Sequence, residues 1–221
     1  MPLNLPRQAV IFDMDGLLID SEPLWHQAEL DVFRSLGKDP STHGLISDTL
    51  GMRIDQVVQL WYQLSPWSGE TLEAVTQRII ARAVTLVDEH RPLLPGVEQA
   101  LERVKESGLK IGLASASPLF MLEKVLEMFE LRHFFDHIES AEHLPYSKPH
   151  PEVYLLAAAH LDVPADRCIT LEDSVNGMIA TKAARMRSIV VPDAAYREDP
   201  RWVLADVKLD SLLEFSVEHL R

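Results

Sequence analysis

The stretch AVIFDMDG, residues 9–16, decides how this sequence can fold. Four apolar residues in succession are typical of a short strand that is buried on both faces of a parallel sheet. Asp13 and Asp15 follow this strand directly, and Gly16 then lets the chain turn so that both carboxylates can border one cavity. The stretch therefore predicts a central strand that ends in a polar site.

Helical periodicity dominates the segment that follows this strand. Ser21, followed by an acid and a proline, is a good helix start, and apolar residues then recur at near-helical spacing. Two more amphipathic helices are expected over residues 55–64 and 72–86. Two prolines and a glycine in residues 91–96 interrupt this pattern as a linker would. Residues 21–90 are therefore predicted to be an all-helical unit.

Strands and helices alternate in the rest of the chain, which implies a mostly parallel sheet with helices on both faces. The expected fold class is α/β, with a Rossmann-like core formed by residues 1–20 and 91–221. The helical unit, residues 21–90, is inserted after the first strand as a cap. The predicted helices of the core are 97–106, 119–128, 152–161 and 175–184, and its later strands are 109–114, 135–138, 168–171 and 188–191.

Composition excludes several classes of function. The chain has 221 residues, and its formal net charge of -13 argues against a nucleic-acid partner, which would require clustered Lys and Arg. No stretch approaches the roughly 18 uncharged apolar residues that a membrane helix requires. The single cysteine, Cys168, cannot form an internal disulfide, which favours a reducing compartment. We expect a soluble, cytoplasmic monomer with neither a membrane nor a nucleic-acid partner.

The carboxyl ends of the strands carry the candidate chemistry, because ligands of open parallel sheets bind there. Asp13 is a candidate nucleophile that could form an acyl phosphate and so split one hard displacement into two easier steps. Asp15 is a candidate general acid that protonates the leaving group and then activates water. A run of Asp-x-Asp-Gly alone could be an acidic turn, so the other strand ends matter.

Two later segments offer groups that could bind a phosphate. Ser115 ends the second core strand, where its hydroxyl and the backbone N–H groups that open the next helix could hold phosphate oxygens. Lys148 lies between serine and proline in SKPHP, residues 147–151, and could neutralise a transferring phosphoryl group. Taken singly, Ser115 is more often a helix cap and Lys148 more often a surface lysine.

Glu172 and Asp173 follow another apolar strand and precede a helix. Asp173 is placed to join Asp13 on a hard divalent cation, since Mg²⁺ prefers oxygen ligands. Four carboxylates at one site would otherwise repel one another strongly. Capping of the helix by these acids is the simpler reading, and the two roles are compatible.

Taken in order, the segments around Asp13, Ser115, Lys148 and Glu172-Asp173 resemble the four motifs of the haloacid dehalogenase superfamily, in its helical-cap subgroup. That subgroup includes sugar-phosphate phosphatases and β-phosphoglucomutases. The resemblance implies a phosphatase of small sugar or polyol phosphates that depends on Mg²⁺, with Mn²⁺ or Co²⁺ as substitutes. The roles that it implies are catalysis for Asp13 and Asp15; metal binding for Asp13, Asp15, Glu172 and Asp173; and substrate binding for Asp13, Met14, Asp15, Ser115, Ala116 and Lys148.

The alternatives within this superfamily differ in the residues they need. Asp15 argues against a dehalogenase, because a halide leaves without a proton whereas an alkoxide requires one. Phosphosugar mutases typically carry a histidine at the position of Trp25, so Trp25 favours hydrolysis, although His26 is adjacent. A phosphate-binding module without turnover would have no use for both aspartates.

Three of the four tryptophans, Trp25, Trp61 and Trp67, fall in the predicted cap. Stacking of an aromatic side chain on a sugar and a hydrogen bond from Arg53 would suit a sugar phosphate, so Arg53 is a candidate substrate-binding residue. The simpler interpretation of Trp61 is a buried cap residue. Hinges at residues 19–22 and 91–96 would let the cap open and close.

Overall fold

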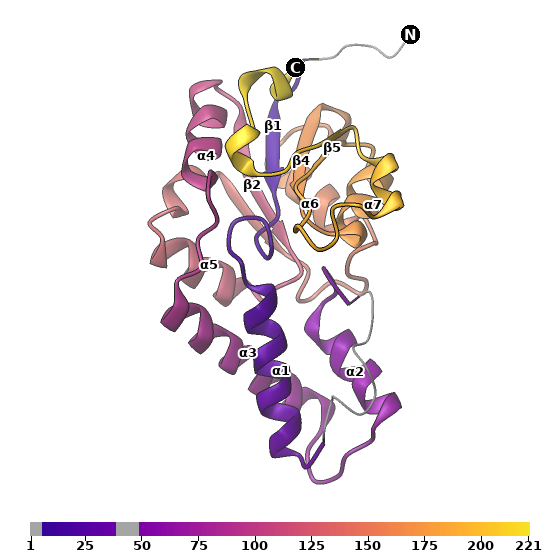
Figure 1. The fold of residues 1–221 in the computed structure, drawn as a ribbon. Helices are drawn as coiled ribbons and strands as arrows, with labels where there is room; N and C mark the ends of the chain where they lie inside the picture. Colours follow the sequence, from indigo (N-terminus) through magenta and orange to yellow (C-terminus); the bar gives the residue numbers. More distant parts are fainter. Residues whose placement is uncertain (1–5, 39–48) are drawn as a thin grey trace.

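The computed structural model describes residues 6–38 and 49–221, which form a six-stranded parallel sheet with helices on both faces and three further helices beyond the carboxyl ends of its strands (Figure 1). The strand order is β3-β2-β1-β4-β5-β6, so the order reverses between β1 and β4. The strands are β1 (Ala9–Phe12), β2 (Lys110–Ser115), β3 (His137–Ser140), β4 (Cys168–Glu172), β5 (Arg187–Val190) and β6 (Val207–Lys208).

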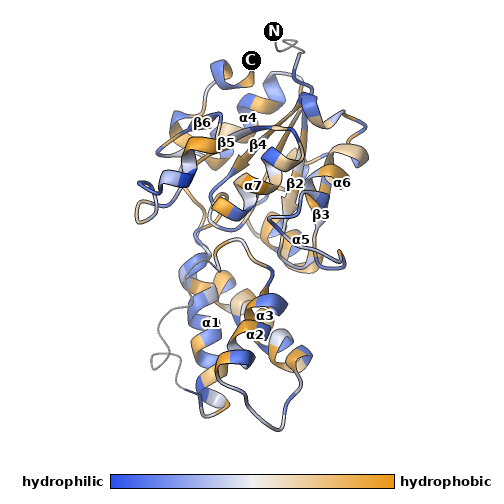
Figure 2. Cartoon of the chain, turned by 90° about the vertical axis from the view of Figure 1, so that its right-hand side faces the viewer, coloured by the Kyte–Doolittle hydropathy of each residue, from blue (hydrophilic) through white to orange (hydrophobic). Residues whose placement is uncertain are grey.

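Seven α-helices accompany this sheet in the described ranges, and α1, α2 and α3 lie together away from it (Figure 1). Each of these three carries hydrophilic and hydrophobic segments (Figure 2), as expected of amphipathic helices. The helices are α1 (Glu22–Ser35), α2 (Ile54–Leu64), α3 (Leu72–His90), α4 (Val97–Glu106), α5 (Leu119–Met128), α6 (Glu152–His160) and α7 (Val175–Ala183). The 3₁₀ helices within the described residues are Arg132–Phe134, Ala165–Arg167, Pro200–Leu204, Leu212–Glu214 and Val217–Leu220.

Strand β1 is buried on both faces, which explains its continuous apolar sequence. Val10 and Phe12 belong to a core cluster that includes buried residues of α4 and α5. Ala9 and Ile11 point the other way and pack with α6. Successive side chains of a strand alternate between faces, so a strand covered on both sides has no polar position.

The register of the sheet brings the ends of three strands level with one another. Phe12, the last residue of β1, pairs with Leu113 of β2 on one side and with Leu171 of β4 on the other. Asp13 therefore emerges beside Ser115 and Glu172, at the point where the strand order reverses. Ligands of open α/β sheets bind at this place.

The two connections between the helical unit and the sheet run side by side. The backbone N–H of Leu94 donates to the Leu18 carbonyl at 2.9 Å, and that of Asp20 donates to the Pro92 carbonyl at 2.8 Å. These bonds place the predicted hinges against each other. The limits of the cap, residues 21–90, and its hinged motion stay predictions.

The structure confirms the α/β fold class and corrects two details. The strand predicted over residues 135–138 is β3 and begins two residues later, because Phe135 is a buried loop residue whose ring meets Phe12 edge-on at 6.4 Å. Strand β6 was not predicted, since two residues carry no periodicity. Within the described ranges, no helix combines the length and apolarity needed to cross a bilayer.

Candidate active site

The strand ends and the helical unit enclose a cavity of about 590 Å³, including its open mouth. Its floor is formed by residues that the sequence singled out: Asp13, Asp15, Ser115, Ala116 and Lys148. Residues of α1 and α2 and the loop before α2 form the opposite wall. The cavity therefore combines an acidic floor with a wall supplied by the helices.

Lys148 is the centre of the polar contacts beneath this floor. Its Nζ donates to Asp13 Oδ1 at 2.8 Å, to Glu172 Oε1 at 2.6 Å and to the Ala114 carbonyl at 3.2 Å. The Lys148 side chain is only 1% exposed, and its Nζ lies 5.0 Å from the centre of the Tyr154 ring. All its protons are thus directed at fixed acceptors, which is what a buried ammonium requires.

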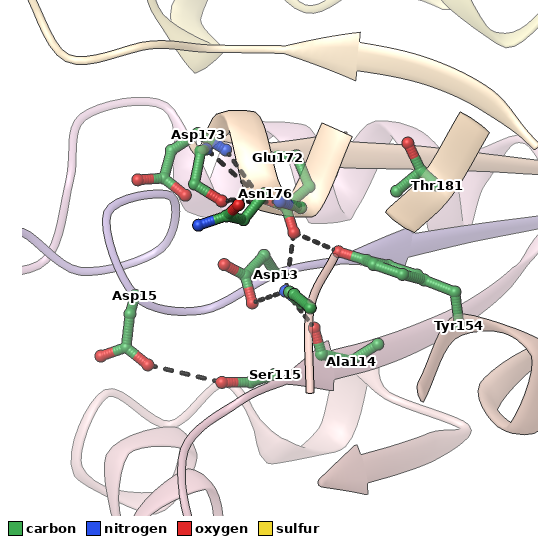
Figure 3. Close-up of polar contacts among 12 residues, drawn as sticks. Asp13, Asp15, Ala114, Ser115, Tyr154, Glu172, Asp173, Asn176 and Thr181 are labelled. Atoms are coloured by element: carbon green, nitrogen blue, oxygen red, sulfur yellow. Dashed lines mark hydrogen bonds and ion pairs between the residues drawn. The ribbon is translucent and has the colours of Figure 1, made fainter. Parts of the chain in front are cut away.

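Glu172 holds Lys148 in place, and both of its own carboxylate oxygens accept hydrogen bonds from neighbouring groups (Figure 3). Its Oε1 accepts from Lys148 and from the Tyr154 hydroxyl. Its Oε2 accepts from the Ser174 hydroxyl and from the backbone N–H groups of Asp173 and Ser174. The structure therefore shows Glu172 as the anchor of the lysine, and its predicted contact with a metal stays a prediction.

Asp13, Glu172 and Asp173 offer carboxylate oxygens that lie within 4.8 Å of one another. Asp173 Oδ1 is buried and has no hydrogen-bond partner among the described residues. Three carboxylates face the single ammonium of Lys148, so their full ionisation leaves an excess of negative charge. This donor set and the unpaired oxygen fit a hard divalent cation such as Mg²⁺.

The acid–base equilibria of the cluster reflect this charge excess. Burial raises the pKa of Asp13 to about 8, although the nearby ammonium of Lys148 lowers it. Burial, reinforced by the charges of Glu172 and Asp13, raises the pKa of Asp173 well above its ordinary value. Burial alone would lower the pKa of Lys148, but Asp13 and Glu172 more than offset this and raise it. Without a metal the cluster therefore takes up protons near neutral pH.

Asp15 is held by donors at both of its oxygens. Oδ1 accepts from the Ser21 hydroxyl at 2.7 Å and from Trp25 Nε1 at 2.9 Å. Oδ2 accepts from the hydroxyls of Ser117 at 2.7 Å and Ser115 at 3.4 Å. The carboxylate is thereby fixed at the cavity, between the first strand and the helical unit.

Two glycines provide space for the carboxylates. Gly16 has φ +78°, and a Cβ at this position would lie 2.0 Å from Asp173 Oδ2. A Cβ at Gly177 would lie 1.8 Å from Glu172 Oε1. Both positions therefore depend on the missing side chain for the packing of the site.

Arg53 and Met14 were predicted to bind substrate, but neither is among the residues that line the cavity. The Arg53 guanidinium donates to Asp55 and, at 2.7 Å in each case, to the carbonyls of Ala141 and Leu144. These contacts tie the helical unit to the core and turn the charge away from the cavity. The Met14 side chain is fully buried in the apolar core, so only its backbone can border the floor. Substrate binding by either residue stays a prediction.

Several contributors to the site were not predicted from the sequence. Tyr154 reads as an apolar residue of α6, and its hydroxyl contact with Glu172 depends on packing between elements far apart in the chain. Asn176 donates its Nδ2 to the Leu50 carbonyl at 2.9 Å, which joins α7 to the loop before α2. Gly177 carries a usable signal, because a glycine inside a predicted helix indicates close packing.

We predict that Gly177→Ala destabilises the protein, although alanine normally favours a helix over glycine by about 1 kcal/mol. The added methyl group would displace the Glu172 carboxylate, and with it Lys148. Thermal unfolding measures this loss. Gly112→Ala is the control and should cost less, since its Cβ would approach closely only the flexible end of Leu161, Cδ1 at 2.9 Å, and would make ordinary contact with Ile11 at 3.5 Å. An increase in Tm for Gly177→Ala would contradict this packing.

We predict that Lys148→Met costs about 3–5 kcal/mol of stability at pH 8, because it leaves buried carboxylates unpaired. The raised pKa of Asp13 means that the folded state binds a proton more tightly than the unfolded state. Stability is therefore lost as pH rises toward 8, and without the lysine this loss should grow. With chelator present, the Tm of Lys148→Met should therefore fall below that of the wild type by less at pH 6 than at pH 8.

Lys182→Met provides the matched control, because Lys182 forms an exposed ion pair with Asp206 at 2.7 Å. Its removal should change stability by about 1 kcal/mol or less at either pH. Equal deficits for the two variants would show that Lys148 does not hold the cluster together.

Comparisons with known proteins agree with this arrangement. The family model described as haloacid dehalogenase-like hydrolase matches residues 10–191. The chain is 63% identical over 220 residues to Hexitol phosphatase B of Escherichia coli strain K12, covering 99% of each protein.

Two solved structures share the fold. A mutant of CbbY from Rhodobacter sphaeroides, in complex with xylulose-(1,5)bisphosphate, superposes with a TM-score of 0.84 at 28% identity, covering 97% of this chain and 99% of that one. A β-phosphoglucomutase from Clostridium difficile gives a TM-score of 0.82 at 28% identity, covering 97% and 95%. The predicted family and the predicted phosphatase activity are confirmed by these matches. The chain belongs to the haloacid dehalogenase-like hydrolase family, and within it to the phosphatases.

Proposed function

We propose that this phosphatase hydrolyses small sugar and hexitol phosphates through a phosphoryl group that is transiently bonded to Asp13. Candidate substrates are 2-deoxyglucose 6-phosphate, sorbitol 6-phosphate and mannitol phosphate. The observation that carries the proposal is that Asp13 and Asp15 face one cavity, with Lys148 fixed on Asp13 at 2.8 Å. The similarity to Hexitol phosphatase B supports the substrate class.

In the first step, a carboxylate oxygen of Asp13 attacks phosphorus while the bond to the ester oxygen breaks. The departing alkoxide takes a proton from Asp15, which lies at the same cavity. Lys148 offsets part of the negative charge at Asp13. The products of this step are the free alcohol and an acyl phosphate on Asp13.

In the second step, a water molecule attacks phosphorus while Asp15 removes a proton from that water. The bond between Asp13 and phosphorus breaks, which releases inorganic phosphate and restores the carboxylate. The hydroxyl of Ser117, 2.7 Å from Asp15 Oδ2, can donate to the ionised carboxylate or accept from the protonated one. Asp15 can therefore keep its orientation in both protonation states.

The phosphate group would be held by Ser115 and by the backbone N–H of Ala116, and Lys148, whose protons are already bound to protein acceptors, would contribute its positive charge. All three residues line the cavity, as does Pro118, which precedes the N-terminus of α5. A helix N-terminus adds partial positive charge toward an anion.

We propose Mg²⁺ as the cofactor, with Mn²⁺ or Co²⁺ as substitutes, held by Asp13, Asp173 and the backbone carbonyl of Asp15, with Glu172 beside them. The ion would neutralise charge on the phosphate oxygens. Support comes from the clustered carboxylates and from the unpaired Asp173 Oδ1.

A phosphosugar mutase is the second candidate, favoured by the shared fold of the β-phosphoglucomutase. The contact of Trp25 Nε1 with Asp15 Oδ1 supports hydrolysis instead, because an indole supplies no acid or base there. Conversion of glucose 1-phosphate to the 6-phosphate, followed with and without the enzyme, distinguishes the two.

We further propose that residues 21–90 close over the core as a cap and that the protein is a cytoplasmic monomer.

We predict that Asp13→Asn abolishes phosphate release from a panel of sugar and hexitol phosphates, because an amide cannot form the acyl phosphate. Asp15→Asn should reduce turnover by about 100- to 10,000-fold, the usual contribution of a general acid. The measurement is the inorganic phosphate released in the presence of Mg²⁺ and in the presence of a chelator. Wild-type activity should vanish in chelator and return when Mg²⁺ is added back.

Asp20→Asn is the control for the loss of one carboxylate next to the site, since the Asp20 side chain is exposed. This variant should keep wild-type turnover. Hydrolysis by Asp13→Asn at the wild-type rate would exclude Asp13 as the nucleophile.

A further inference from the structure

Helix α1 presents two carboxylates and one indole to the cavity. Glu22, Trp25 and Glu29 follow the spacing i, i+3, i+7, which places them on one face of the helix, and all three line the cavity opposite the catalytic floor. Trp25 is already engaged with Asp15. The two glutamates have no place in the two chemical steps, so another role must be sought for them.

Glu29 is held in position from the neighbouring helix. Trp61 Nε1 of α2 donates to Glu29 Oε2 at 3.2 Å, and the Trp61 ring is itself buried against Phe33 at 5.2 Å between centroids. Burial raises the pKa of Glu29 to about 7, although this hydrogen bond lowers it. Burial and the charge of Asp15 raise the pKa of Glu22 to about 8.

Positive charge is scarce in this cavity. Among the described residues that line it, Lys148 is the only Lys or Arg, and its ammonium is bound to Asp13 and Glu172 beneath the floor. Arg53 adjoins the lining but directs its guanidinium at Asp55 and at core carbonyls. Residues 39–48 contain neither Lys nor Arg in sequence.

The same face of α1 also borders a wider groove that includes Arg197 and Arg201. These arginines lie within ion-pair distance of acids, Arg197 with Asp210 at 3.3 Å and Arg201 with Asp199 at 2.6 Å. Acids outnumber arginines in the lining of this groove, which also includes Asp20, Asp173 and Asp193. The end of the cavity away from the floor has a net acidic character.

This arrangement favours a neutral, hydroxyl-rich group over a second phosphate. A hydroxyl can donate to an ionised carboxylate or accept from a protonated one, so it suits the glutamates in either state. A second phosphate would bring about 1.5 to 2 negative charges beside these two carboxyl groups, which would repel it when ionised and would have to stay protonated to tolerate it. Within the described lining, the one ammonium is already bound to Asp13 and Glu172 and cannot offset that charge. Like charges at close range in a partly desolvated site repel strongly.

We propose that Glu22 and Glu29 form a subsite that binds the uncharged polyhydroxy tail of the substrate and rejects esters that carry a second phosphate at the far end. This subsite rests on the proposed hydrolysis of sugar and hexitol phosphates and defines its specificity. Glu22 and Glu29 thereby select monophosphates, while Asp13 and Asp15 act on the ester itself.

The test compares sorbitol 6-phosphate with sorbitol 1,6-bisphosphate, which differ only in the second phosphate. With Mg²⁺ present, wild-type kcat/KM should be at least about 100-fold higher for the monophosphate. Glu29→Gln keeps the shape of the side chain and removes its charge, so it should narrow this preference by about 10-fold, chiefly through KM for the bisphosphate. Glu29→Lys should narrow it further.

Glu89→Gln is the matched control, because it removes the same charge from an exposed position of α3 and should leave the preference unchanged. Thermal unfolding checks the fold of each variant, and Glu29→Gln should be at least as stable as wild type at pH 8, since it removes the charge of a partly buried carboxylate whose pKa is raised. Equal kcat/KM values for the two esters, or an unchanged preference in both Glu29 variants, would overturn the subsite and leave the proposed hydrolysis intact. Phosphate release from neither ester would refute both proposals.

Discussion

The contact between the Lys148 ammonium and the carboxylates of Asp13 and Glu172 is the constraint on which the site depends. An ammonium that is almost fully buried is stable only if its protons meet fixed acceptors, and Glu172 and Asp13 supply them. Glu172 is anchored in turn by Tyr154 and by the start of α7. The position of Asp13 therefore depends on the hydrogen bonds that link Lys148, Glu172 and Tyr154 behind the cavity.

The fold explains why these groups meet. Parallel strands that end level with one another place Asp13, Ser115 and Glu172 at a single edge, and the reversal of strand order opens that edge between β1 and β4. The helical unit then approaches over the loop before α2. A Cβ at Gly51 would lie 2.4 Å from Ser174 Oγ, so this loop and the start of α7 are packed at close range. The cavity is thus bounded by elements that are far apart in the sequence.

Much of this arrangement could be predicted from local patterns. The continuous apolar run before Asp13 identified the buried strand, and the carboxylates at successive strand ends indicated where they would gather. Contacts that depend on long side chains could not be predicted in this way. Arg53 illustrates the limit, since its neighbours line the cavity while its guanidinium reaches core carbonyls that no periodicity could reveal. Tyr154 and Glu29 were missed for the same reason: their partners lie on other elements.

Calorimetric titration of the metal-free protein with Mg²⁺ at pH 7, in two buffers with different ionisation enthalpies, tests the charge balance of the site most directly. Burial of Asp13 and Asp173 in an excess of negative charge holds protons on the cluster, and a divalent ion should expel them. We expect saturable binding with a net release of protons and an affinity that increases with pH. Binding without proton release, or no binding of Mg²⁺, would contradict it.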